Sequence, residues 1–244
     1  LGVAIVAGLL GFLAPFERML LDVQTRLGDT PASGEITIVE IDAKSIEALE
    51  QWPWPRKFHA EALTKIAAAD PRLISFDVDF SSKQSSVDDA ALGAALEKTS
   101  ATVILAAFEQ DVEGGSRRTA SLPLPALRAS SFVGSANVMP DPDGAVRTYP
   151  VATEINGILC PSLATLTAEA NLPDTEAVVI DYAIDPDTIG RLSFVDVLRG
   201  DFDPSAISGK RVLIGATAIE LGDRYHIPGH GLLPGVVVQA LAAE

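Results

Sequence analysis

Acidic side chains cluster at the ends of two predicted β-strands, where they are suited to bind a cation. In the segment LISFDVDF, side chains alternate between the two faces of the strand, so Asp77 and Asp79 share the face opposite to the hydrophobic residues. The same alternation places Glu40 and Asp42 together in ITIVEID. If these two strands pair in parallel, four carboxylates converge. Such a cluster is costly unless a cation, a basic side chain or a protonated carboxyl group relieves the repulsion.

A site for a small molecule or a cation is therefore predicted at the carboxyl ends of the first strands, formed by Asp42, Asp77, Asp79 and Asp223. In open α/β sheets, ligands bind in the crevice outside these strand ends. Asp223 is included because it follows the apolar segment RVLIGAT closely. Two alternatives stay open. The carboxylates are solvated strand ends, or Arg56 and Arg224 neutralise them in a structural ion-pair network.

The segment WPWPR holds two tryptophans and an arginine in a stiff stretch of chain. Each proline restricts the preceding residue to extended geometry, which holds Trp52 and Trp54 in place, and Pro55 is suited to open a helix. Arg56 then lies in the first helical turn, where its charge is unfavourable unless a carboxylate answers it. These three side chains either stabilise the core or contact a ligand.

Other chemical motifs are incomplete. The segment DVDFS resembles the D-x-D-x-[ST] opening of haloacid-dehalogenase phosphotransferases, but Lys210 precedes Thr217, so the order of the later motifs fails. His226 and His230 are separated by Pro228, which prevents a helical metal pair. We therefore expect neither enzyme activity nor a cofactor.

The elements that position these residues alternate between strands and helices. Short β-branched segments at 36–42, 73–80 and 102–108 are separated by helical patterns near 55–70 and 87–99. This order predicts an α/β fold with a mixed, largely parallel sheet covered by helices.

The middle of the chain predicts an antiparallel meander, because the turn residues at 141–144 and Asn156-Gly157 separate three short segments. These segments are 132–139, 146–154 and 158–160. The remaining predicted elements are helices at 161–171 and 234–244 and strands at 178–184 and 211–217.

The composition favours one large folded domain. The chain has 244 residues, of which 48% are hydrophobic, and this length is sufficient for a substantial core. A net charge of −15 opposes binding to a phosphate backbone, which excludes nucleic acid as a partner. The single cysteine, Cys160, cannot form an intrachain disulfide.

The first 16 residues carry no charge and predict the truncated end of a transmembrane helix, since a spanning helix needs about 20 apolar residues. Helical spacing of hydrophobic residues continues to Leu27. We therefore expect a long N-terminal helix over 1–27 that anchors a domain of residues 28–244 to a membrane. Small residues in this helix permit close helix approach and predict a homodimer; they are Gly2, Ala4, Gly8 and Gly11.

A series of short motifs also occurs in a defined order along nearly the whole chain. They are the apolar helix followed by Glu17, Arg18, Leu21, Asp22 and Arg26, the strand ITIVEID, Ser45, the segment WPWPR, the strand with FDVDF, Asp88, Asp143-Gly144 with Arg147, the segment KRVLIG, Asp223, Pro228 and Pro234-Gly235-Val236. Together they resemble the CHASE2 family, the extracytoplasmic sensory domains of bacterial transmembrane receptors. One departure is Gln239, near which the family pattern has a histidine.

The resemblance implies a periplasmic or extracellular sensory module that controls a cytoplasmic output, such as a nucleotide cyclase, a histidine kinase or a diguanylate cyclase. It implies no particular ligand. Two alternatives are a structural dimerisation or protein-interaction domain without a small ligand, and a metal-dependent phosphotransferase.

Overall fold

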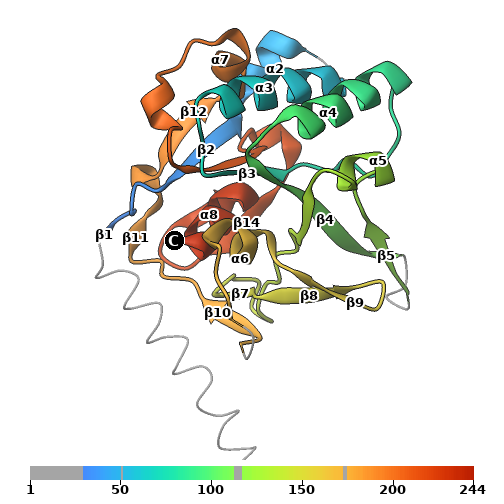
Figure 1. Cartoon of the computed structure of the whole chain (residues 1–244). Coiled ribbons are helices and arrows are strands. Elements are labelled where there is room, and N and C mark those ends of the chain that lie inside the picture. The colour runs from blue at the N-terminus through green and yellow to red at the C-terminus, as the bar shows by residue number, and fades with distance from the viewer. Residues whose placement is uncertain (1–29, 51, 113–116, 173–174) are drawn as a thin grey trace, which may run out of the picture.

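The computed structural model describes residues 30–50, 52–112, 117–172 and 175–244. Within these ranges the chain forms seven α-helices and a mostly parallel seven-stranded sheet, with helices on both faces (Figure 1). The predicted α/β class is confirmed. The N-terminal helix predicted over 1–27, with its membrane and dimer roles, lies outside the described residues.

The central strands, in spatial order, are β12 (Gly190–Ser193), β2 (Ile36–Ile41), β13 (Arg211–Ala216), β3 (Leu73–Asp77) and β4 (Thr102–Val112). All neighbours in this series are parallel. The long strand β4 also pairs in parallel with β6 (Phe132–Ser135) and antiparallel with β5 (Arg117–Ser121). Strand β13, which comes late in the chain, therefore lies between the two strands that come first.

Helices form a layer on each face of this sheet (Figure 1). One face carries α2 (Ala43–Leu49), α3 (Arg56–Ala68), α4 (Ser86–Lys98), α5 (Pro125–Arg128) and α7 (Phe194–Arg199). The other carries α6 (Leu163–Ala168) and α8 (Gly235–Ala243). The sheet is thus covered on both sides, as its nearly continuous apolar strands require.

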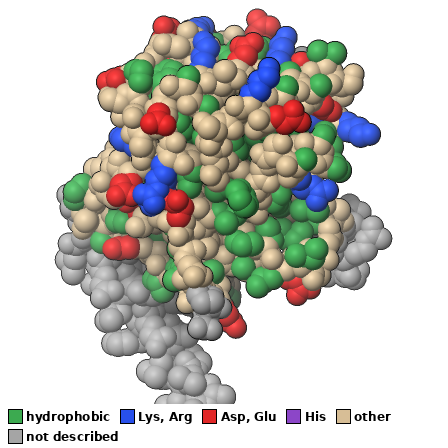
Figure 2. Space-filling view, viewed as in Figure 1, with side chains coloured by type: hydrophobic (Ala, Val, Ile, Leu, Met, Phe, Trp, Pro, Cys, Tyr) green, Lys and Arg blue, Asp and Glu red, His purple; other side chains and the backbone are tan. Residues whose placement is uncertain are grey.

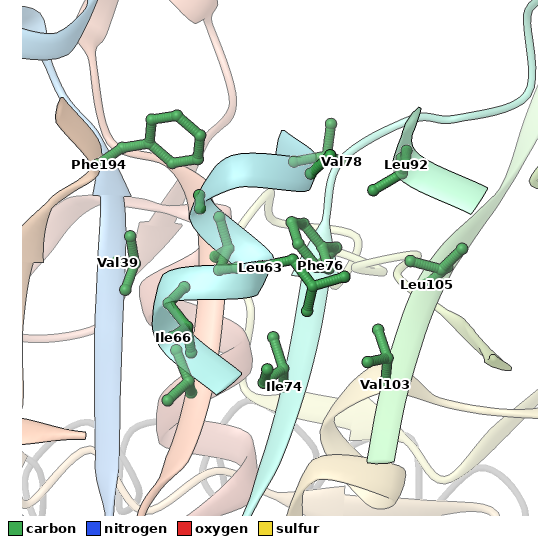
Figure 3. Close-up of a cluster of buried hydrophobic side chains, with 14 of the residues drawn as sticks. Val39, Leu63, Ile66, Ile74, Phe76, Val78, Leu92, Val103, Leu105 and Phe194 are labelled. Carbon is green, nitrogen blue, oxygen red and sulfur yellow. The ribbon is translucent and has the colours of Figure 1, made fainter. Parts of the chain in front are cut away.

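The alternation predicted for β3 is confirmed. Ile74 and Phe76 enter the core beneath α3 and α4, as Figure 3 shows. Ser75 points to the opposite face, where its hydroxyl lies 2.8 Å from the hydroxyl of Thr167 in α6. Asp77 shares this second face. Burial of each large apolar side chain in the core stabilises the fold by about 1.5–3 kcal/mol.

The WPWPR segment packs against the same core. Trp54 is 1% exposed, and its ring centroid lies 4.9 Å from that of Phe194. Arg56 is 2% exposed, pairs with Asp89 and donates to the carbonyl of Ser82. Asp89 is therefore the carboxylate that neutralises the arginine in the first turn of α3.

The predicted meander is present only in part. Strands β8 (Ala152–Ile155) and β9 (Ile158–Pro161) form an antiparallel hairpin, and Asn156 and Gly157 have the positive φ angles, 52° and 78°, that a two-residue type I′ turn requires. The meander was wrong for β6, which joins the parallel sheet beside β4. In this position β6 packs closely against α6. A Cβ atom at Gly134 would lie only 2.9 Å from the Cα of Leu163 in α6, so this close packing requires glycine.

Short pairs of strands complete the described structure. These are β7 (Thr148–Pro150) with β10 (Ala177–Val179), β1 (Thr30–Pro31) with β11 (Ile184–Asp185), and β14 (Arg224–Ile227) with β15 (Gly231–Pro234). The single strand predicted over 178–184 is therefore two short strands with different partners. Figure 2 shows hydrophobic side chains gathered at the lower right of one face, where Figure 1 places β9 with its exposed Ile158 and Leu159.

His59 generates a test of this core. Its imidazole is buried among Phe76, Phe80 and Phe194, and burial together with the Arg56 charge lowers its pKa from 6.5 to about 3. As the pH falls through this range, only the unfolded chain takes up a proton on this residue, so folding stability is lost. We expect a contribution of up to about 1.4 kcal/mol per pH unit to the free energy of unfolding.

Urea unfolding of wild type and His59→Leu between about pH 3 and pH 7 measures this contribution. The difference between the two proteins should change with pH in the stated direction. His226→Gln, at an exposed histidine, is the matched control. Parallel curves for wild type and His59→Leu contradict the prediction.

Candidate functional site

A crevice of about 410 Å³ opens at the carboxyl ends of β2, β13, β3 and β4. Its volume falls within the range of small-molecule pockets. The polar lining includes Asp77, Asp79, Glu109, Asn137, Asp223, Tyr225 and Gln239. The apolar lining includes Trp52, Val78, Phe108, Val138 and Leu221.

Asp77 lies at the base of the polar lining. It is the last residue of β3, and the alternation of that strand directs its side chain toward α8. The Nε2 atom of Gln239 in α8 donates a hydrogen bond to its Oδ2 atom at 2.7 Å. This bond links the end of β3 to α8, in the helix layer that also contains α6.

Gln239 has a second polar atom that is not satisfied. The side chain is 1% exposed, and its Oε1 atom has no hydrogen-bond partner among the described residues. A buried acceptor without a partner destabilises a fold by about 1–3 kcal/mol. The amide therefore holds an unsatisfied acceptor beside a half-buried carboxyl group.

Asp223 supplies the second carboxyl group, at the N-terminus of α8; like Asp77, it is half-buried. A Cβ at Gly235 would lie 2.3 Å from its Oδ2 atom, so only glycine permits this approach. The N–H of Gly235 donates to the carbonyl of Asp223 at 3.1 Å. The start of α8 lacks a side-chain cap, and a carboxylate beside a helix N-terminus is electrostatically favourable.

The electrostatics of the crevice favour uncharged side chains. Burial raises the pKa of Asp77 well above its usual range, the nearby Asp223 raises it further, and the hydrogen bond from Gln239 opposes both effects. Burial also raises the pKa of Asp223, while hydrogen bonds from Tyr225 and from the Gly235 N–H lower it. Tyr149 has a strongly raised pKa because of burial and the same carboxyl groups.

Four of the predicted site residues line the crevice: Trp52, Asp77, Asp79 and Asp223. The other three lie elsewhere. Asp42 caps α2, where it accepts from the backbone N–H of Ser45 at 2.8 Å, and Trp54 and Arg56 belong to the core described above.

The four carboxylates predicted to converge do not do so, because β2 and β3 do not pair with each other. Strand β13 lies between β2 and β3, and its Gly215 pairs with Glu40 on one side and Asp77 on the other. Side chains on strands two places apart are separated by about 10 Å. Glu40 forms an ion pair with Arg191 instead, at 2.7 Å between Oε1 and the guanidinium.

A known domain family matches the whole chain. The sequence profile of the CHASE2 domain matches residues 1–244. The chain belongs to the CHASE2 domain family. CHASE2 domains are extracytoplasmic sensory domains of membrane receptors, so this CHASE2 domain is a sensory domain. Searches of curated proteins and of solved structures found no match.

The described part of this CHASE2 domain contains no helix long and apolar enough to span a bilayer. It also contains no group of three or more His, Cys, Asp or Glu side chains placed to hold a metal ion. No lysine or arginine is among the described residues that line the crevice. The predicted counter-charges have other partners, since Arg56 pairs with Asp89 and Arg224 donates to the carbonyl of Leu232 at 2.7 Å.

Sequence reasoning missed three groups around the carboxyl pair of this CHASE2 domain: Tyr149, Tyr225 and the acceptor on Gln239. Only Gln239 gave a usable signal, because it is the single polar residue in the apolar helix VVVQALAA. A buried polar residue in such a helix needs a partner. The two tyrosines lie on short strands whose pairing is not evident from the sequence.

Gly215 generates the first prediction of this section. A Cβ there would lie 2.7 Å from the Cβ of Val236 in α8 and 3.1 Å from that of Asp77. Gly215→Ala should therefore lower the free energy of unfolding by about 1–3 kcal/mol, because it forces α8 away from the sheet. Chemical denaturation measures the change.

Gly93→Ala is the matched control, since a Cβ at this helical position would meet only a Leu127 methyl group at 3.9 Å. It should raise stability by about 0.5–1 kcal/mol. Equal effects of the two substitutions argue against close packing at Gly215.

Asp77 generates the second prediction. Its raised pKa means that the folded state holds a proton that the unfolded chain has released, so stability falls as the pH rises above about 4. Asp77→Asn removes this loss and retains an acceptor for Gln239. The variant should therefore be more stable than wild type near pH 7, and the difference should shrink toward pH 4.

Thermal or urea unfolding across this pH range measures the difference. Asp187→Asn removes the same charge at an exposed position outside the crevice and is the matched control. A difference between Asp77→Asn and wild type that does not depend on pH is the contradicting result.

Proposed function

We propose that this CHASE2 domain is the extracytoplasmic input domain of a bacterial transmembrane receptor and that its ligand occupies the crevice between Asp77, Asp223 and α8. The observation that supports this proposal is the free acceptor on Gln239, buried beside two carboxyl groups in a cavity. Other buried polar atoms of the described residues also lack a partner, Trp54 Nε1 and His59 Nδ1 among them, but of these residues only Gln239 lines the crevice. A ligand with matching donors satisfies this acceptor.

The same geometry supports a route from ligand to output. Asp77 belongs to the sheet, whereas Gln239 and the N-terminal turn of α8 belong to one helix. In this proposal α8 has two positions relative to the sheet, and a ligand that binds between Asp77 and α8 changes their relative stability. Signalling then follows as a shift in the populations of these two states. The receptor output in this proposal is a cytoplasmic enzyme such as a nucleotide cyclase, a histidine kinase or a diguanylate cyclase.

Anchoring through residues 1–27 and homodimerisation belong to the same proposal. Both rest on the uncharged run of the first 16 residues and its small side chains. In a homodimer, two input domains lie side by side at the membrane, and each can control the output domain of its own chain within the pair.

The test uses the full receptor in membranes, with its output measured for wild type, Asp77→Asn and Gln239→Met. Both crevice variants should change the output or its response to stimulus by about tenfold or more, a factor that corresponds to the loss of one buried polar interaction. Asp187→Asn should behave as wild type. An unchanged output in both crevice variants, at equal expression, contradicts the proposed site.

A further inference from the structure

The geometry points to a primary ammonium group as the part of the ligand that enters the crevice, with its three N–H donors received by Asp77, Asp223 and Gln239. This inference rests on the proposed function, because it names the chemical class of ligand for the same site. The group belongs to a small organic amine with an apolar body.

The charge balance of the crevice supports a cation. The donors that approach the two carboxyl groups are the amide of Gln239, the hydroxyl of Tyr225 and the N–H of Gly235, and all of them are neutral. Two half-buried carboxyl groups without a basic neighbour cannot both ionise at low cost. A ligand cation supplies the charge that the described lining residues lack.

The number of acceptors supports an ammonium rather than another cation. The amide of Gln239 occupies one oxygen of Asp77, and the Oε1 atom of Gln239 is unpartnered among the described residues. An ammonium group carries three rotatable donors and accepts no hydrogen bond. It satisfies acceptors from three separate elements at once, whereas a quaternary ammonium ion leaves the buried amide oxygen unpaired.

The described residues include no group of three or more His, Cys, Asp or Glu side chains placed to hold a metal ion. A hard divalent cation takes about six or more oxygen ligands. A guanidinium group fits best against one carboxylate, which it binds through two parallel hydrogen bonds. The carboxyl groups here come from two different elements, and the third acceptor is a single amide oxygen.

The remainder of the crevice supports an apolar body on the ligand. Trp52, Phe108 and Leu221 line the same cavity of about 410 Å³, which is much larger than one ammonium group. Aromatic faces also attract an organic cation. An arylalkyl amine therefore matches both the polar and the apolar parts of the crevice lining.

Isothermal titration of the purified chain with phenethylammonium tests the inference. Saturable binding is expected, about tenfold or more tighter than that of the neutral phenethyl alcohol or the quaternary phenethyltrimethylammonium. Asp77→Asn and Gln239→Met should each weaken binding by about tenfold or more, because the first removes a negative charge beside the ammonium group and the second removes an acceptor. Asp187→Asn, which removes an exposed charge, should bind within a factor of about two of wild type.

Gln239→Lys is a second, independent variant. It supplies an ammonium group from α8 itself, so it should abolish phenethylammonium binding and raise the melting temperature. If the Gln239→Lys variant still binds the probe as wild type does, the placement of the ammonium group is contradicted.

Absence of binding by phenethylammonium overturns the inference, as does equal binding of the alcohol or the quaternary ion. If Mg²⁺ or an anion binds instead and the crevice variants abolish that binding, the ammonium class is wrong but the proposed site stands. If none of these probes binds and the crevice variants leave receptor output unchanged, the proposed function fails as well.

Discussion

The close contact between α8 and strand β13 is the constraint on which the candidate site depends. Val236, in the first turn of α8, packs directly onto Gly215, and no larger residue fits at that position. One turn further along, this approach brings Gln239 to Asp77. At the start of the helix, Gly235 admits the carboxyl group of Asp223. Gly215 thus sets the distance between the sheet and α8, and Gly235 sets the distance between α8 and Asp223.

This packing also explains why a well-packed fold contains two neighbouring carboxyl groups with no basic side chain beside them. The core on the other face of the sheet is apolar and is sealed by aromatic rings around His59. Asp77 is not among the side chains of this core. The fold therefore tolerates two poorly solvated carboxyl groups at one edge, where their cost is offset by burial elsewhere.

Much of the architecture could be predicted from local patterns. Alternation in β3 separates Phe76 from Asp77 without knowledge of any partner strand, and Asn156-Gly157 specifies its own hairpin. Non-local pairing could not be predicted in this way. Nothing in ITIVEID or LISFDVDF indicates that a third strand separates them, so the predicted convergence of Glu40 with Asp77 failed on sheet order. Asp42 failed for another reason, because it lies beyond the end of β2 and its side chain caps α2.

The position of β13 has a consequence for how the domain assembles. Arg211, its first residue, pairs with Ile36 and with Leu73, so the centre of the sheet is closed by contacts between distant parts of the chain. Closing such long loops carries a large entropic cost and slows folding. Until β13 arrives, β2 and β3 present unpaired edges that invite aggregation. The central part of the sheet therefore cannot be completed before the C-terminal part of the domain is present.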